Sequence, residues 1–332
     1  QAAADRTTAL YRHLFSNETV EPISHAAVTR RLSHDENDEL LEDAVRLHRE
    51  IAKKHDLIIV EGLVPTSRDA FASQLNADLA KALDAKVLIV STADIRNPAA
   101  AAEKIETQLR HFGGAGNART AGVLFMRTKG LPEGAAQVPV TLDPNLRLIS
   151  DINSFTAELK KRNANIGTEA FPVIGLVPFS NTLSVPRMSD LAAHISAHWI
   201  NEGEAKQRRV LHSSLIASNI EHELHKFVAG ELIISASDRI DVLLASSLAN
   251  SNGIPLAGLV LTEHHQPNEQ VLDFCQTAIK QGLPIVHTPL STFETAQELA
   301  NLSNEIPVDD TERAEQVTRF VSSHIDPAWL TR

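Results

Sequence analysis

The stretch with the clearest chemical pattern is Leu57–Val60, where four apolar residues end abruptly on Glu61 and Gly62. The apolar run predicts a buried strand. In an open parallel sheet, ligands bind just past the carboxyl ends of the strands, so Glu61 would face a bound group and Gly62 would let the backbone approach it. The alternative is a strand-end carboxylate that caps a turn or the following helix.

A second set of oxygen-bearing side chains lies near the start of the chain, at Asp5, Thr7 and Thr8. Together with Glu61 they would offer two carboxylates and two hydroxyls, which could hold a Mg²⁺ that carries phosphate, since hard cations take oxygen ligands. The alternative is that Asp5 only caps a helix over Thr8–Phe15.

A third candidate is the segment Ser235–Arg239, which follows an apolar run and precedes a helical pattern. Backbone amides at a helix start bind anions, and Arg239 adds a bidentate fork for phosphate or carboxylate. In the alternative, Asp238 is the N-cap residue and Arg239 pairs with Asp241 or with a neighbouring subunit.

Other chemical motifs are absent or misplaced. His222 and His225 are three residues apart, not four as in the zinc pattern of metalloproteases, and a solvated helix face is expected. No Gly-Lys-Ser/Thr phosphate loop occurs in the 332 residues, and Cys275 is expected to be buried and inert. We therefore assign no catalytic residue and no metal ligand.

Strand and helix patterns alternate along the chain, which predicts parallel sheets with right-handed crossovers. Asn97 followed by Pro98 predicts the start of one of the helices. A polar, proline-bearing junction at 178–186 separates two such series. The expected strands are 57–60, 87–90, 122–126 and 172–177 in the first series, and 210–216, 232–234, 259–261 and 284–287 in the second.

The spacing of apolar residues in the C-terminal segment predicts an amphipathic helix over 311–324. Val317, Phe320 and Val321 would lie on one face, and Trp329 follows just beyond the helix. Tryptophan often anchors interfaces, so Phe320 and Trp329 are interface candidates. The alternative is that Trp329 completes the core of its own module.

Composition restricts the classes of function. The chain is 43% hydrophobic and 22% charged, with a net charge of −11, which argues against general binding to nucleic acid or anionic membranes. A single cysteine excludes an internal disulfide framework and predicts a cytoplasmic protein. No apolar run reaches the ~18 residues of a membrane span.

These residues carry a family resemblance. The chain resembles the amino-terminal region of the long form of phosphate acetyltransferase in segments that span nearly its whole length in the family's order. In the first half these are 60–66, 71–76 and 112–114. In the second half they are 200–203, 208–210, 237–239, 306–310 and 326–329.

The resemblance implies an α/β fold with two successive three-layer modules built on parallel sheets. It implies a domain similar to dethiobiotin synthetase at 1–186, without its first strand and phosphate loop, and an Asp-Arg-Thr-Gly-Gly-type domain at 187–305. Residues 306–332 would form a helix leading toward an acetyltransferase domain absent from this chain. Thr262-Glu263-His264 stands where relatives carry Thr-Gly-Gly, a departure from the family's pattern.

The function implied is that of a regulatory and oligomerisation region, not catalytic by itself. The parent enzyme would convert acetyl-CoA and phosphate to acetyl phosphate and CoA. No cofactor is expected in this chain, and acetyl-CoA and CoA would bind the parent enzyme. Expected partners are its acetyltransferase domain, further copies of the chain and small metabolite effectors. Alternatives are an ATP-dependent carboxylate ligase of the dethiobiotin synthetase type and a stand-alone metabolite sensor.

Overall fold

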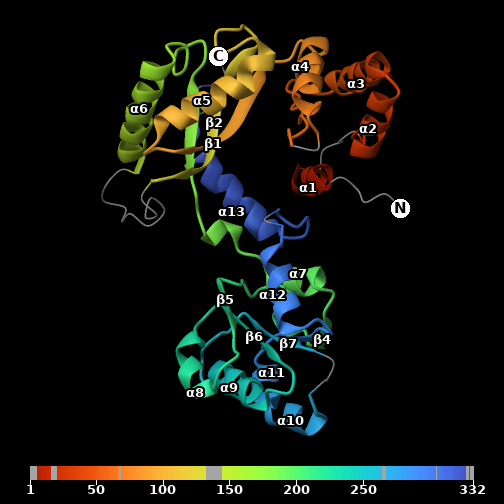
Figure 1. The fold of residues 1–332 in the computed structure, drawn as a ribbon, viewed down its shortest axis with the longest axis vertical. Coiled ribbons are helices and arrows are strands. Elements are labelled where there is room, and N and C mark those ends of the chain that lie inside the picture. The colour runs from red at the N-terminus through yellow and green to blue at the C-terminus, as the bar shows by residue number, and fades with distance from the viewer. Residues whose placement is uncertain are drawn as a thin grey trace. The chain divides into compact units, whose positions relative to one another are not determined.

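A computed structural model describes residues 6–15, 21–66, 69–131, 144–263, 267–303, 305–326 and 329 (Figure 1). The chain forms two compact units, one of residues 1–180 with 308–332 and the other of residues 181–307. The C-terminal segment, which the sequence analysis set apart as 306–332, is thus counted with the first unit. Among the described residues, no helix has the length and apolar character needed to cross a membrane.

Over the residues that the structure describes, the sheet of the first unit has three parallel strands in the order β1-β2-β3. Its strands alternate with two helices, and right-handed crossovers in a constant direction place both helices on one face. Asn97 caps the first of these helices, as predicted, by accepting a hydrogen bond from the Ala100 amide at 3.1 Å. The elements are β1 (Val87–Asp94), α5 (Pro98–Leu109), β2 (Thr120–Lys129), α6 (Pro144–Arg162) and β3 (Val173–Pro178).

One core fills the space between these helices and the sheet. Phe125 of β2 and Phe155 of α6 meet edge to face, with ring centroids 5.3 Å apart. Such aromatic pairs contribute about 1 kcal/mol beyond the area they bury. Fully buried residues of both helices and of the sheet surround them, among them Ile105, Leu109, Val123, Leu159 and Leu176.

In the described part of the chain, four helices precede this sheet: α1 (Arg6–Phe15), α2 (His25–Ser33), α3 (Asn37–Ala52) and α4 (Ala72–Ala82). Ser33 is the last residue of α2 and its hydroxyl donates to the Arg30 carbonyl at 2.6 Å, so it does not cap α3. Glu36 is itself the N-cap residue of α3 and makes no side-chain capping bond.

The predicted strand at Leu57–Val60 is wrong, since residues 57–66 have no regular secondary structure. A strand exists only when a neighbouring strand receives its backbone hydrogen bonds, and no described strand pairs with this segment. Ile59 is 78% exposed and Val64 is 74% exposed, so the apolar composition of the segment does not reflect burial here.

The described strands of the second unit form one sheet of five in the order β4-β8-β7-β6-β5, with β4 antiparallel and the others parallel. The strands are β4 (His198–Asn201), β5 (His212–Leu215), β6 (Glu231–Ala236), β7 (Gly258–Thr262) and β8 (Ile285–His287). The parallel strands were all predicted, whereas β4 was not, because its four residues carry no apolar alternation.

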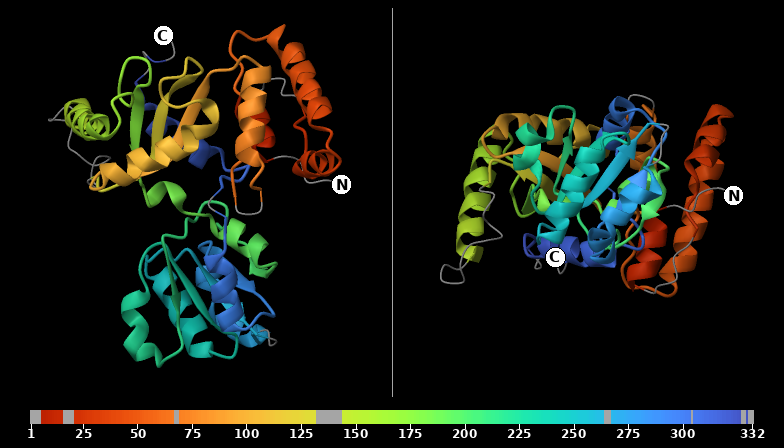
Figure 2. Two further views of the ribbon diagram at one scale, coloured as in Figure 1. Left: turned by 45° about the horizontal axis from the view of Figure 1, so that its top comes forward. Right: turned by 90° about the horizontal axis from the view of Figure 1, so that it is seen from below.

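Helices cover both faces of this sheet (Figure 2). Ile233, Leu259 and Ile285 face one core, while Leu232, Val260 and Val286 face the other, as the alternation of side chains along strands requires. The helices are α7 (Met188–His194), α8 (Ile220–Glu223), α9 (Ile240–Ser251), α10 (Glu269–Phe274), α11 (Gln276–Lys280) and α12 (Thr292–Ala300).

The C-terminal helix α13 (Thr311–Ser322) belongs to the first unit. Beyond it, Ile325 forms an antiparallel bridge with Gly175 of β3, and the Asp326 amide donates to the Ile174 carbonyl at 2.9 Å. Gly175 is needed for this approach, because a Cβ there would overlap the His324 carbonyl. The segment after α13 is therefore fixed to the sheet edge by backbone contacts.

Candidate functional site

A pocket of about 410 Å³ lies at the carboxyl edge of the five-stranded sheet, within the second unit. Parallel sheets bind ligands at this edge, and the volume falls in the range of small-molecule sites. The pocket is formed by the ends of β5 and β6, the loop before α9 and the first turns of α12. It is lined by Leu215, Ile216, Ala217, Ala236, Asp238, Arg239, Thr292, Phe293 and Ala296.

Most of this lining is apolar, and Phe293 is 74% exposed although it is a large aromatic residue. Asp238 is exposed as well, and within the described chain its carboxylate makes no side-chain hydrogen bond. The pocket therefore offers an aromatic surface and a carboxylate that can accept hydrogen bonds from a ligand. Such a combination of apolar wall and few polar groups is typical of metabolite sites.

Arg239, the other charged lining residue, is already engaged inside the protein. Its guanidinium donates to both carboxylate oxygens of Asp241 at 2.9 and 2.8 Å and to the Ser218 carbonyl at 2.9 Å. This pair raises the pKa of Arg239 and lowers the pKa of Asp241. The predicted alternative that Arg239 pairs with Asp241 is thus confirmed, and its charge is largely balanced.

The expectation that Asp238 caps α9 is wrong. The N-cap residue is Arg239, one position later, and it makes no side-chain capping bond. Asp238 therefore lies in the loop before α9, where it borders the pocket and does not cap the helix. Ser235 and Ser237 of the same segment are buried, and the Ser235 hydroxyl donates to the Ile216 carbonyl at 3.4 Å.

The loop after β7 is held close to the same edge. The hydroxyls of Thr262 and Thr292 lie 2.7 Å apart and connect the end of β7 to the start of α12. Glu263 has a left-handed backbone with φ of +77°, and it occupies the position where the family resemblance places a glycine. Glu263 therefore replaces one of the family's glycines at a position whose backbone conformation favours glycine.

The candidates of the first unit do not form a comparable site. Asp5 lies outside the described residues, Thr7 and Thr8 are half-buried in α1, and Glu61 is exposed in the irregular segment after α3. Among the described residues, no group of three or more His, Cys, Asp or Glu could hold a metal ion. The Mg²⁺ arrangement of Asp5, Thr7, Thr8 and Glu61 stays a prediction.

Gly62 has a different role from the one predicted. The side chain of Asn76 in α4 binds the backbone of Leu63 twice, accepting from its amide at 2.9 Å and donating to its carbonyl at 2.8 Å. A Cβ at Gly62 would lie 2.9 Å from the Asn76 amide oxygen. In the structure, then, the group that approaches this glycine is a side chain of the protein itself.

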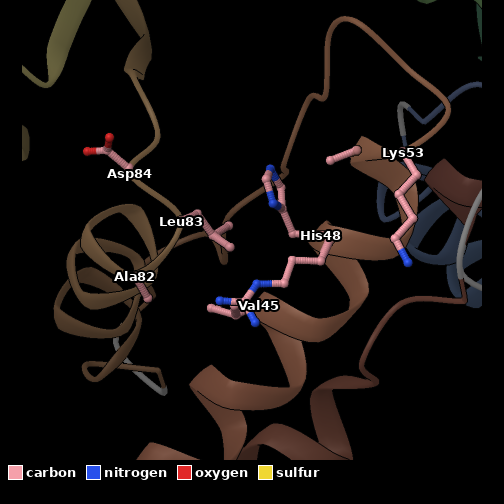
Figure 3. A pocket seen from close by; sticks show the side chains of 8 residues that line it. Val45, His48, Lys53, Ala82, Leu83 and Asp84 are labelled. Atoms are coloured by element: carbon pink, nitrogen blue, oxygen red, sulfur yellow. The ribbon is translucent and has the colours of Figure 1, made fainter.

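A second pocket, of about 510 Å³, lies between α3 and the end of α4 in the first unit (Figure 3). His48 borders it from α3 and Lys53 from the position directly after α3, and Leu83 and Asp84 border it from the chain after α4. Asp84 pairs with Arg119 at 2.5 Å. Lys53 and Asp84 are exposed, whereas His48 and Leu83 are half-buried.

Three further residues were singled out from sequence. Cys275 is buried, as predicted, and burial raises the pKa of its thiol. The indole nitrogen of Trp329 donates to the Ala121 carbonyl of β2 at 3.2 Å, and the Phe320 ring lies 4.5 Å from the His324 ring. Both aromatic residues thus make contacts inside the first unit, and their proposed role at an interface stays a prediction.

Thr292 and Phe293 line the pocket, although neither was predicted from the sequence. A signal was present, because Ser291 and Glu294 form a capping box in which each side chain binds the other's backbone amide. That pattern marks a helix start directly after β8, and hence at the carboxyl edge of the sheet. The exposure of Phe293 could not be read from it.

Comparison with known families agrees with this architecture. The family model described as "AAA domain" matches residues 1–187, more than half of the chain. The chain belongs to this AAA-domain family. A second model, the "DRTGG domain", matches residues 190–302, so the AAA-domain segment is followed by a DRTGG domain that contains the pocket.

Relatives of this AAA-domain chain are named phosphate acetyltransferase. The protein of Acinetobacter baylyi is 68% identical over 98% of the chain and 45% of its own length. Those of Pseudomonas putida and Salmonella typhimurium are each 33% identical, over 98% and 99% of the chain and 44% and 46% of their own lengths. The predicted resemblance to a region of phosphate acetyltransferase is confirmed, and the chain spans about 45% of the length of these relatives.

One solved structure has a weak likeness to the AAA-domain chain. It contains the CBS and DRTGG domains of the regulatory region of Clostridium perfringens pyrophosphatase, complexed with the activator diadenosine tetraphosphate. It is 15% identical, covers 39% of this chain and 50% of its own, and has a TM-score of 0.31. A likeness this low supports no conclusion about ligands of the present chain.

Proposed function

We propose that the chain is a regulatory and assembly region of phosphate acetyltransferase. The parent reaction would be acetyl-CoA plus phosphate to acetyl phosphate plus CoA. The observation that carries the proposal is the match of 98% of the chain to proteins of that name, over only 45% of their length.

The effector site of this region is the pocket bordered by Asp238, Arg239 and Phe293. Phe293 would contact an apolar or planar part of the ligand, and Asp238 would accept hydrogen bonds from its hydroxyl groups. An anionic group of the effector would replace Asp241 on the Arg239 guanidinium, because carboxylate and phosphate fit the same bidentate fork. Binding would then release the start of α9 from its present ion pair.

Two substitutions test this site in the longer enzyme. Arg239→Lys keeps the charge but loses the fork, and we expect it to weaken the effector response. Asp241→Asn frees the fork, and we expect it to strengthen binding of an anionic effector. Basal acetyl transfer should stay within about twofold in both, because coupling between sites is separate from the reaction itself.

The measurement is acetyl-transfer activity with and without metabolites. Pyruvate and reduced nicotinamide adenine dinucleotide are the first metabolites to test, as the family resemblance suggests. Arg319→Lys, an exposed arginine of α13 in the other unit, is the matched control. An unchanged response in both Arg239→Lys and Asp241→Asn would reject the pocket as the effector site. Robust acetyl transfer by the 332-residue chain alone would reject the proposed role.

A further inference from the structure

The helix α9 has an outer face made almost entirely of large apolar side chains. Its four most exposed positions over Ile240–Leu248 are Ile240, Asp241, Leu244 and Leu248, and three of these are aliphatic. Their exposed fractions are 47% for Ile240, 38% for Leu244 and 63% for Leu248. A helix that is apolar on all sides is normally covered on all sides. We call Ile240, Leu244 and Leu248 the α9 stripe.

The stripe lies opposite the side of α9 that packs on the sheet. Val242 and Leu243 are fully buried in the core formed with β6, β7 and β8. Because β5, β6, β7 and β8 are neighbours in chain order, the helices that connect them share one face, with α9 between α8 and α11. The stripe is therefore the outermost part of the middle helix in this layer, where a flat partner surface could reach it.

The stripe carries no net charge. Asp241 is the one charged residue of α9, and the Arg239 guanidinium binds both of its carboxylate oxygens. The whole chain has a net charge of −11, so two copies repel each other over most of their surface. Contact between copies is thus least opposed at a neutral, apolar face such as this one.

The spacing of the stripe favours contact with an identical stripe. Its residues are four apart and form one i±4n ridge, about 12 Å long at 1.5 Å per residue. Ridges of this kind on two helices interdigitate at a crossing angle near −50°, the commonest class of helix packing. A two-fold axis through the middle of α9 would bring Leu244 of one copy next to Leu244 of the other.

We propose that the α9 stripe is a self-association surface, on which two copies of this chain pack α9 against α9 about a two-fold axis. The proposal deepens the assembly role proposed above and assigns that role to named residues. It concerns the outer face of α9, whereas the pocket lies at the carboxyl edge of the sheet.

A charge-swap experiment tests the two-fold contact. We expect the wild-type chain to be a dimer by sedimentation velocity, and Leu244→Glu and Leu244→Lys each to raise the dimer dissociation constant at least ~100-fold, since like charges would meet unpaired at the axis. An equimolar mixture of the two variants should recover the dimer, because each Glu then faces a Lys. This recovery is specific to a contact in which residue 244 meets its own counterpart.

Ile59→Glu is the matched control, because it places the same charge at an exposed aliphatic residue of the other unit and should leave the dimer intact. Circular dichroism and thermal melting should show that all variants fold, as Leu244 is exposed. A monomeric wild-type chain, a dimer that survives Leu244→Glu, or a mixture that stays monomeric would overturn the proposal. Effector binding at the Arg239 pocket should be measured on the same variants. If the self-association surface is rejected while effector binding is intact, the proposed regulatory role still stands.

Discussion

The imidazole Nε2 of His287 lies 2.7 Å from the backbone carbonyl oxygen of Glu263. The Glu263 amide donates in turn to the Leu290 carbonyl at 2.9 Å. These two contacts hold Glu263 in its left-handed conformation, with φ of +77°, although a side chain makes that conformation unfavourable. The strain lies in the loop that borders the carboxyl edge of the second sheet, next to the proposed effector pocket.

We expect Glu263→Gly to stabilise the protein by about 1 kcal/mol, because glycine adopts positive φ without the penalty that a Cβ brings. Glu263→Ala is the control, since alanine keeps the Cβ and hence the strain, and it should change stability little. Equilibrium denaturation by urea measures both. Equal effects of the two substitutions would show that the backbone at 263 is not strained.

Asn76 fixes the irregular segment 57–66 by its two hydrogen bonds to Leu63. We expect Asn76→Ala to speed amide hydrogen exchange at Leu63 about 10-fold or more, since each lost bond is worth about 1 kcal/mol. Gln74→Ala, which removes an exposed contact to Asp78 on the same helix, is the control. An unchanged exchange rate at Leu63 in Asn76→Ala would show that other contacts hold the segment.

Cys275 should be unreactive in the folded chain. Its side chain is buried, and burial raises the pKa of the thiol, so little thiolate forms near neutral pH. We expect alkylation by N-ethylmaleimide at pH 7.5 to be about 100-fold slower than in urea-unfolded protein. As the pH is raised further, the native rate should keep rising after the rate of the unfolded chain has levelled off, because the native thiol ionises at a higher pH. Similar rates in both states would contradict the buried placement.

We expect no tight binding of ATP by the 332-residue chain, despite its membership of an AAA-domain family. The sequence contains no Gly-Lys-Ser/Thr loop to cradle phosphate, and Glu61 would repel phosphate unless Mg²⁺ intervenes. Calorimetry in the presence of Mg²⁺ is the measurement. A dissociation constant near ~1 μM, which is about −8 kcal/mol, would contradict this prediction and favour a nucleotide-dependent ligase.

The elements that could be recognised from sequence are those whose local signals and tertiary environment agree. The strands β6 and β7 are continuous apolar runs because both of their faces are buried, and the Asn97 side chain caps α5 as its position before Pro98 indicates. The segment Leu57–Val60 has the same composition as a buried strand, yet it has no strand partner in the described structure. Pairing is a property of two segments, so one run of residues cannot establish it.

The candidate site was predicted in part, through Asp238 and Arg239. Their place at a strand end followed from local sequence, because the carboxyl ends of parallel strands share one edge of the sheet. The contribution of Phe293, some 50 residues further along, depended on how α12 packs beside the sheet, and no local pattern encodes that.

By itself, the sequence determined the alternation of strands and helices, the parallel sheets and the family. Periodicity, caps and motifs are local, so they can be recognised without knowing which residues are in contact. Only the tertiary structure decided what each charged or apolar group meets. It paired Arg239 with Asp241, placed Asn76 against Gly62, and left Leu244 and Leu248 facing outward on a helix whose composition predicts burial. These outcomes depend on contacts between distant segments, whose free energies arise only once the chain has folded.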